Sequence, residues 1–179
     1  AIYAIMVAKK GQRNHPNKMA MHWTLGCAVM SFVGAGLLGF AHTLPQVNLW
    51  THGTLVTAMH GHMAFWGAYA MLVLAIISYS IPNMTGRKLM NSSISAYAFW
   101  STTVGMVSMT VAFGVAGIAQ VYLERKMGMD FLEVQKAIEI HFLGLILAAS
   151  LFSSGIIAYI YEFIRCGLPT DAPVDKEYV

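Results

Sequence analysis

Residues 50–82 read WTHGTLVTAMHGHMAFWGAYAMLVLAIISYSIP, and this stretch decides the fold. It contains no Lys, Arg, Asp or Glu, and it is longer than the roughly 20 apolar residues that cross a bilayer as a helix. The charge-free region extends on both sides, from Met19 to Thr85, and a second one runs from Leu89 to Leu123. Charge-free stretches of this length predict membrane-spanning segments.

The whole chain has the composition of a membrane protein. Hydrophobic residues make up 57% of its 179 residues and charged residues only 11%, whereas about a quarter of the residues in a soluble domain are charged. The formal net charge of +3 is small and does not indicate a nucleic-acid partner. Cys27 and Cys166 are single and far apart, so the sequence has no disulfide framework and no Cys-based metal motif.

Four complete spans follow from the apolar segments, at about residues 19–42, 54–81, 92–122 and 140–164. Backbone groups in lipid must find partners within the protein, so these spans are expected to be helices and not open strands. The apolar run 1–8 is interpreted as the end of a fifth helix whose beginning is missing, and residues 170–179 as a polar cytoplasmic tail. The predicted fold class is an all-α integral membrane bundle, a single domain fragment over residues 1–179 of a larger bundle.

Prolines near the span ends predict where the helices stop. Pro45, followed by the polar Gln46, is expected to break the pattern after the first span, and Pro82 to end the second. Residues 43–53 and 123–139 are therefore expected to be loops.

Basic residues predict the orientation of the spans. They gather before the first span and after the second, at Lys9, Lys10, Arg13, Lys18, Arg87 and Lys88. Both groups are expected in the cytoplasm. This orientation places the two loops 43–53 and 123–139 outside and returns the C-terminus to the cytoplasm.

The second span carries the motif His60-Gly61-His62. Each residue of a helix turns the chain by roughly 100°, so side chains two apart point about 200° away from each other. The two imidazoles therefore cannot share one metal ion, but each can hold a separate large cofactor. Imidazole is a common axial ligand of haem iron, and Gly61 removes a side chain where two porphyrins would crowd the backbone.

His52 lies eight residues before His60, about two turns nearer the outer surface. Haem propionates would emerge there if the rings stand upright in the bilayer, and an imidazole could donate a hydrogen bond to them or neighbour a bound cation. A histidine that stands alone in a membrane span is more often a helix–helix hydrogen-bonding group than a ligand. We apply that interpretation to His22, His42 and His141.

At these residues the sequence resembles the catalytic subunit of bacterial nitric oxide reductase, in the haem–copper oxidase superfamily. The segment HGHMAFWGAY around the histidine pair carries the resemblance most strongly. Residues 25–48, 114–126 and 131–135 also resemble segments of that subunit, and together these segments correspond to its final part. Gly53 and Gly61 stand where oxidases that use haem a commonly have Asp and Phe, which favours the reductase branch.

The resemblance implies a role for each of these residues. His60 would be the proximal ligand of a high-spin haem b3, and His62 an axial ligand of a low-spin haem b. His52 would lie near the haem propionates, where a Ca²⁺ ion is a further cofactor that the resemblance allows. A non-haem iron opposite haem b3 would be held by residues outside this chain. Thr43 occupies a position near the active-site cavity, and we weigh a role in proton or water delivery equally against a helix-end hydrogen bond.

The implied reaction converts two NO, two electrons and two protons into N2O and water. The implied partners are the remainder of the catalytic subunit upstream of Ala1, the lipid bilayer, and a cytochrome c subunit or quinol as electron donor. The implied location is the bacterial cytoplasmic membrane, with the haem end toward the periplasm.

Three other functions remain open on the sequence. A membrane electron-transfer protein with two b-type haems would hold both of them six-coordinate and bind no gas. An oxygen-reducing haem–copper oxidase subunit I would need a copper site upstream, and an NO-dismutating relative of the reductase is a further alternative.

Overall fold

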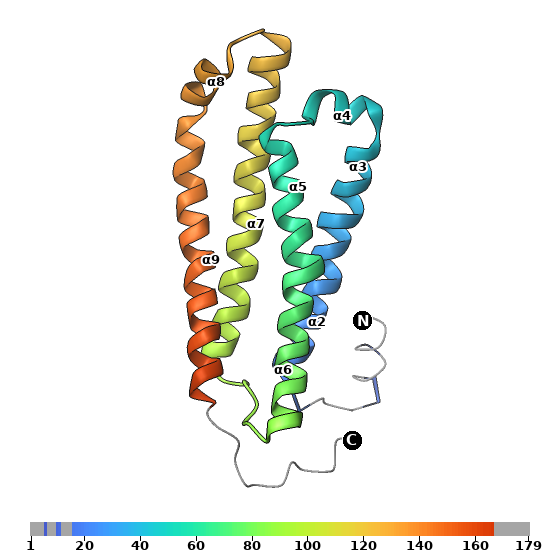
Figure 1. Ribbon diagram of the computed structural model, residues 1–179, viewed down its shortest axis with the longest axis vertical. Coiled ribbons are helices and arrows are strands. Elements are labelled where there is room, and N and C mark those ends of the chain that lie inside the picture. Colours follow the sequence, from blue (N-terminus) through green and yellow to red (C-terminus); the bar gives the residue numbers. More distant parts are fainter. Residues whose placement is uncertain (1–5, 7–9, 12–15, 167–179) are drawn as a thin grey trace.

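The structure is a computed structural model that describes residues 6, 10–11 and 16–166. The expected end of a fifth helix, apart from Met6, and the expected tail at 170–179 lie outside the described residues. Within the described part every regular element is a helix, and the long axes run side by side (Figure 1).

Four helical rods make up the described part of the chain. The first rod comprises α2 (Lys18–Ser31), the π-helical η1 (Phe32–Leu38) and α3 (Gly39–Thr43). The second comprises α5 (Leu55–Phe65), the π-helical η2 (Trp66–Ala70) and α6 (Met71–Thr85). The third comprises α7 (Ser93–Val121) and the π-helical η3 (Tyr122–Lys126), and the fourth is α9 (Glu139–Arg165). Each rod is long and apolar enough to cross a bilayer. The all-α membrane fold expected from the sequence is confirmed.

Side chains before the helices provide the hydrogen bonds that helical geometry leaves open at an N-terminus. Asn17 accepts from the Ala20 N–H before α2, Thr54 accepts from the Val56 N–H before α5, and Ser92 accepts from the Ile94 and Ser95 N–H groups before α7. These polar residues flank apolar runs, so the sequence itself specifies where three of the rods begin.

The expectation that Pro82 ends the second span is wrong. The helix α6 continues through Pro82 and stops at Gly86, whose φ of 66° lies in the left-handed region that favours glycine. Proline lacks the N–H that would bond to the Ser78 carbonyl one turn earlier. The Asn17 side chain donates to that carbonyl instead, at 2.7 Å, so a neighbouring rod replaces the lost bond.

The two expected loops also contain helix. Pro45 begins the short α4 (Pro45–Thr51), because proline is well suited to the first position of a helix, where no N–H is needed. In the second expected loop, residues 123–139, the helix α8 (Phe131–Ala137) precedes the fourth rod. Both short helices lie at the same end of the bundle, as Figure 1 shows. We call this the outer end, after the predicted orientation.

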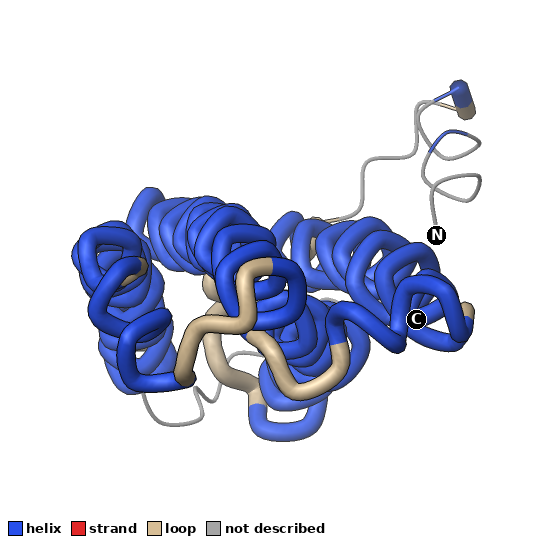
Figure 2. Tube along the Cα trace, turned by 90° about the horizontal axis from the view of Figure 1, so that it is seen from above, coloured by secondary structure: helices blue, strands red, loops and turns tan. Residues whose placement is uncertain are grey.

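The rods are arranged as a row, so the view from above is elongated (Figure 2). The fourth rod packs against α7, α7 packs against α5, and the α5–η2–α6 rod packs against the first rod. The rod with the histidine pair thus has neighbours on two sides.

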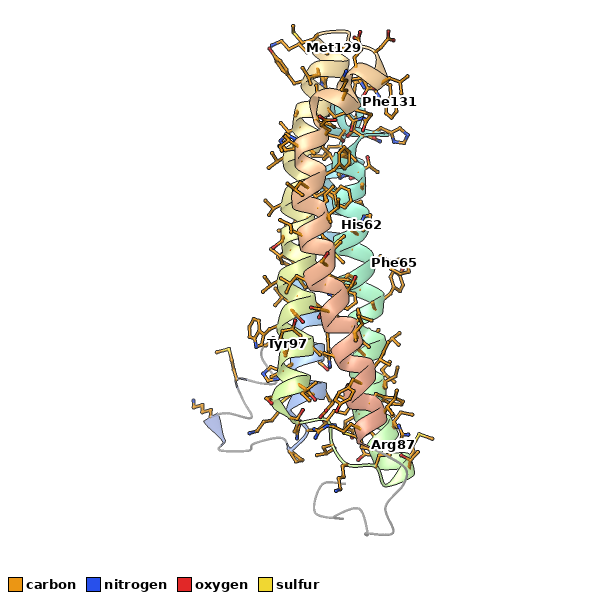
Figure 3. All side chains as sticks on the ribbon, turned by 90° about the vertical axis from the view of Figure 1, so that its left-hand side faces the viewer. His62, Phe65, Arg87, Tyr97, Met129 and Phe131 are labelled. Carbon is orange, nitrogen blue, oxygen red and sulfur yellow. The ribbon has the colours of Figure 1, made fainter. Side chains whose placement is uncertain are left out.

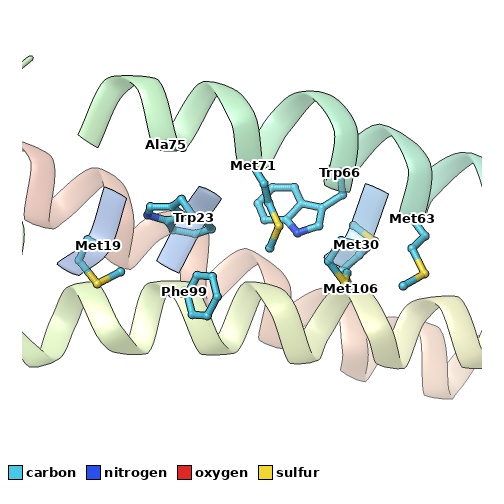
Figure 4. Packing of buried hydrophobic residues seen from close by; sticks show 9 residues of the cluster. All are labelled: Met19, Trp23, Met30, Met63, Trp66, Met71, Ala75, Phe99 and Met106. Atoms are coloured by element: carbon cyan, nitrogen blue, oxygen red, sulfur yellow. The ribbon is translucent and has the colours of Figure 1, made fainter. Parts of the chain in front are cut away.

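Large apolar side chains fill the space between the first three rods. The buried cluster consists of Met19, Trp23, Met30, Met63, Trp66, Met71, Ala75, Phe99 and Met106 (Figure 4). Trp23 is fully buried and makes edge contacts with Phe99 and Tyr159, at ring-centroid distances of 5.1 and 5.7 Å. Methionines adapt to irregular gaps between such rings, and here they fill apolar space.

Glycines let the first and second rods approach backbone to backbone. A Cβ on Gly34 would lie 2.6 Å from the Met63 carbonyl carbon, and a Cβ on Gly67 would lie 2.6 Å from that of Met30. Each rod therefore presents a glycine to a methionine of the other. This double crossing fixes the height of the histidine pair against the first rod.

Candidate functional site

His60 lies on the face of α5 that meets the first rod. Its Nδ1 is 2.9 Å from the carbonyl oxygen of Gly34, in the π-helical η1. A π-helical turn changes the hydrogen bonding of the backbone and often occurs at functional sites. The side chain is half-buried, and its ring is held against the first rod by its contact with Gly34.

His62 lies on a different face of the same helix, beside the third rod. Its Nδ1 is 2.8 Å from the carbonyl oxygen of Ala58, and its ring lies 4.8 Å from that of Phe113 on α7. The imidazole is exposed in this chain, and Figure 3 shows it on α5 with Phe65, whose ring points away from the bundle. The two imidazoles thus diverge as the helical repeat requires.

Both histidines have the hydrogen-bonding state that suits a metal ligand. An imidazole that donates its Nδ1–H to a carbonyl keeps Nε2 unprotonated when it is neutral. Among the described residues, Nε2 of either ring makes no hydrogen bond. Each ring therefore has an available nitrogen lone pair and a fixed orientation, which is the arrangement that metal-bound histidines usually show.

His42, which we interpreted as a helix–helix hydrogen-bonding group, bonds within its own helix. Its Nδ1 is 2.9 Å from the Leu38 carbonyl oxygen. Its ring stacks on that of His60 at a centroid distance of 5.0 Å, and its buried Nε2 has no partner among the described residues. His42 and His60 are eighteen residues apart in the sequence, and nothing in the sequence predicts their contact, because it depends on how the rods cross.

The two glycines near the histidines differ in their surroundings. A Cβ on Gly39 would lie 3.2 Å from Cε1 of His60, so glycine leaves room for that ring. Gly61 is exposed, and a Cβ there would meet nothing within 4 Å. The backbone between the two histidines is therefore open, with room for a large planar group beside it.

His52 lies at the outer end, just before α5 begins. It follows the last residue of α4, its side chain is exposed, and its carbonyl oxygen accepts from Nη2 of Arg125 at 3.3 Å. The arginine is on η3, so the third rod helps to hold the segment that carries His52. The sequence pattern does not predict this contact.

Thr43 is the last residue of α3, and its hydroxyl donates to the Phe40 carbonyl at 2.7 Å. This is the helix-end hydrogen bond, one of the two alternatives weighed for this residue. The role in proton or water delivery stays a prediction.

The other lone histidines make local contacts. Nδ1 of His141 is 3.1 Å from the Ile138 carbonyl oxygen, and the His22 ring lies 5.4 Å from that of Phe99. Within residues 6, 10–11 and 16–166, no three His, Cys, Asp or Glu side chains are grouped so that they could hold a metal ion.

Comparison with known proteins identifies the family. The family model described as cytochrome c and quinol oxidase polypeptide I matches residues 1–151 of the chain. The chain belongs to this oxidase polypeptide I family. The B subunit of nitric oxide reductase from Stutzerimonas stutzeri is 37% identical over 174 residues, which is 93% of this chain. The chain spans 37% of the length of that relative.

Membership in the oxidase polypeptide I family, together with the four long apolar rods, makes the chain part of a multi-pass membrane protein of the haem–copper oxidase type. The resemblance to the reductase branch that the sequence suggested is confirmed by the match to the Stutzerimonas stutzeri protein. Haem groups are the cofactors that this family suggests.

Proposed function

We propose that this chain is the haem-binding part of a nitric oxide reductase, which converts 2 NO, 2 electrons and 2 protons into N2O and H2O. The observation that carries the proposal is the pair of divergent imidazoles on α5, each with Nδ1 against a carbonyl and Nε2 available. The match of 93% of the chain to a nitric oxide reductase polypeptide supports this reaction over oxygen reduction.

In this proposal each histidine binds its own haem through Nε2. His60 is the proximal ligand of the high-spin haem b3, and its Nδ1–H on Gly34 fixes the ring and increases its basicity. His62 is one axial ligand of the low-spin haem b, with Ala58 as the corresponding acceptor. Gly61 leaves the backbone open between them, and His52 neighbours the propionates and a Ca²⁺ ion.

The haems and a non-haem iron supply the electron transfer and the binding of NO, whereas the protein supplies orientation and a dry site. The residues for the iron, and the second ligand of haem b, come from the rest of the catalytic polypeptide. For Thr43, a role in delivering protons or water stands equally beside the helix-end hydrogen bond to Phe40. Electrons come from a cytochrome c subunit or quinol. The membrane is the bacterial cytoplasmic membrane, with the haem end toward the periplasm.

Single replacement of the two histidines tests the proposal in the purified intact membrane protein. His62→Ala is expected to remove the low-spin b-type absorption bands and leave carbon monoxide binding to the reduced protein. His60→Ala is expected to remove the high-spin haem and carbon monoxide binding. His141→Ala, which replaces a membrane histidine far from the pair in sequence, serves as the control and is expected to leave both spectra unchanged.

Three results would contradict the proposal. Protein that contains no b-type haem excludes it outright. Two haems that are both six-coordinate and bind no carbon monoxide indicate the electron-transfer protein instead. The family description also includes oxygen-reducing oxidases, so copper in place of non-haem iron in a metal analysis would favour that reaction.

A further inference from the structure

The first N–H of the histidine helix is bound by a side chain from another rod. Gln120 on α7 is almost fully buried, and its Oε1 accepts from the Leu55 N–H at 2.8 Å. Leu55 is the first residue of α5, where a backbone N–H has no partner within its own helix. Thr54 already caps the next N–H, that of Val56. The start of α5 is therefore held both by its own cap and by α7.

Glu124, one turn beyond Gln120, determines which way the amide points. Nε2 of Gln120 donates to Oε2 of Glu124 at 3.0 Å. A carboxylate only accepts hydrogen bonds, so the NH2 group must face it. The amide oxygen is consequently directed at Leu55, and the assignment of oxygen and nitrogen follows from the network.

The face of α7 that carries Gln120 packs closely against the outer half of α5. Gly114, Gly117 and Gln120 follow at intervals of three residues, so they lie along one side of the helix. A Cβ on Gly114 would lie 2.8 Å from Sδ of Met59, and a Cβ on Gly117 would collide with the backbone of Val56. The two backbones are thus in close contact, and the Gln120 hydrogen bond fixes their relative height.

This anchor lies close to the proposed ligands. His60 follows Leu55 by five residues, a rise of roughly 7.5 Å along the helix at about 1.5 Å each. On the outer side, Arg125 holds the carbonyl of His52. Because α5 is continuous from Leu55 to Phe65, any displacement of its start is transmitted to both imidazoles.

We propose that Gln120, oriented by Glu124, is a positioning residue for the histidine ligands of the haems. This inference rests on the haem ligation proposed above. Gln120 does not touch a haem in this proposal; it sets where α5 begins and so where Nε2 of each histidine lies. Outer-shell groups of this kind typically affect metal affinity by about 10- to 100-fold.

A reciprocal exchange of the two side chains tests the inference in the intact haem-containing protein. Gln120→Glu places two carboxylates against each other, so the bond to Leu55 is expected to be lost. The double variant Gln120→Glu with Glu124→Gln has the wild-type net charge. In it, the carboxylate introduced at position 120 can accept both from the Leu55 N–H and from the amide introduced at position 124, so the anchor is expected to be restored.

The readouts are the iron–histidine stretching band in the resonance Raman spectrum and the rate of haem loss to an acceptor protein. Gln120→Glu is expected to shift the band and to increase haem loss about tenfold, and the double variant to return both to wild-type values. Gln120→Met, which removes the acceptor without adding a charge, is expected to shift the band in the same direction and provides a second variant. Gln46→Glu, at an exposed glutamine of α4, is the matched control.

Each outcome decides between a positioning and a purely structural role. The inference is overturned if Gln120→Glu and Gln120→Met change the melting temperature but leave the haem bands unchanged. It is also overturned if the iron–histidine band and the rate of haem loss of the double variant are no closer to wild type than those of Gln120→Glu. Wild-type protein without haem would instead overturn the proposed function itself. The anchor is supported when Gln120→Glu shifts the iron–histidine band and the double variant restores it.

Discussion

Single side chains in this molecule complete backbone hydrogen bonds that helix geometry leaves open. Asn17 donates to the Ser78 carbonyl, and Gln120 accepts from the Leu55 N–H. In lipid an unpaired backbone group costs several kcal/mol, because no water can replace the missing partner. Polar residues inside these spans therefore connect one rod to the next.

Asn17 and Pro82 are expected to be coupled energetically. Asn17→Ser keeps a side chain that can cap α2 but is too short to reach Ser78, so it should lower the free energy of unfolding by about 1–3 kcal/mol. In a Pro82→Ala background, the introduced alanine supplies its own N–H to the Ser78 carbonyl, and the same change should cost less than about 1 kcal/mol. Denaturant unfolding in mixed micelles measures this double-mutant cycle. Equal costs in the two backgrounds would mean that the proline does not create the need for Asn17.

Cys166, directly after α9, offers a pH-dependent reaction outside the spans. Burial, and then the nearby carboxylate of Glu162, raise the pKa of its thiol. The thiolate is the reactive form, so maleimide labelling should be slow at pH 7 and increase about tenfold per pH unit while the pH stays below the pKa. In a Cys27→Ala background, the rate should level off at a higher pH in the folded protein than in the unfolded protein. Identical pH profiles for the two states would contradict the raised pKa.

At the scale of elements, the crossing of the first and second rods depends on small residues. Lipid gives no hydrophobic driving force between helices, so close van der Waals packing is a main source of association. The contacts of Gly34 with Met63, and of Gly67 with Met30, are backbone contacts that cannot yield to an added methyl group. The hydrogen bond of His60 to Gly34 lies in the same crossing.

Gly34→Ala and Gly36→Ala form a matched pair for testing this crossing. A Cβ on Gly34 meets backbone at 2.6 Å, whereas one on Gly36 finds its nearest neighbour at 3.7 Å. Gly34→Ala should destabilise the protein by about 1–3 kcal/mol, as overpacking does. Gly36→Ala should be neutral or stabilise by up to about 1 kcal/mol, since alanine favours helix. Thermal unfolding in detergent compares them, and an equal melting temperature for both variants would rule out the tight crossing.

The sequence predicts the elements better than the contacts between them. The rods follow from charge-free stretches, and the divergence of His60 and His62 follows from the helical repeat alone. Pro82 is misjudged because its local effect, a missing N–H, is compensated by Asn17, 65 residues away in the chain. Gln120 and His42 gave no signal, because the importance of each depends on which rod lies opposite.

At the scale of the whole molecule, the apolar rods end in polar segments that indicate an orientation. The start of α2, which carries Lys18, and the connection from α6 to α7, which carries Arg87 and Lys88, lie at the end opposite α4 and α8 (Figure 1). Positive charge is retained on the cytoplasmic side of membrane proteins. We therefore expect α4 and α8 to face the periplasm.

Cysteine accessibility tests the orientation on intact cells. Met127, between η3 and α8, and Met84, near the end of α6, have 59% and 80% of their surface exposed and lie at opposite ends of the bundle. In a background without Cys27 and Cys166, Met127→Cys should react with a membrane-impermeant maleimide added outside. Met84→Cys should react only after the membrane is permeabilised, and the reverse pattern would invert the topology.

The placement of both imidazoles on one helix has a consequence for tuning the two proposed haems. A displacement of α5 along its axis would carry both imidazoles with it, one past the Gly34 carbonyl and the other past Phe113. Under the proposed function, such a displacement would change both iron–histidine bonds together, so the two reduction potentials would be linked. Improvement of a single haem must come from the groups around it, such as Gly39 and His42 for one ring and Phe113 for the other.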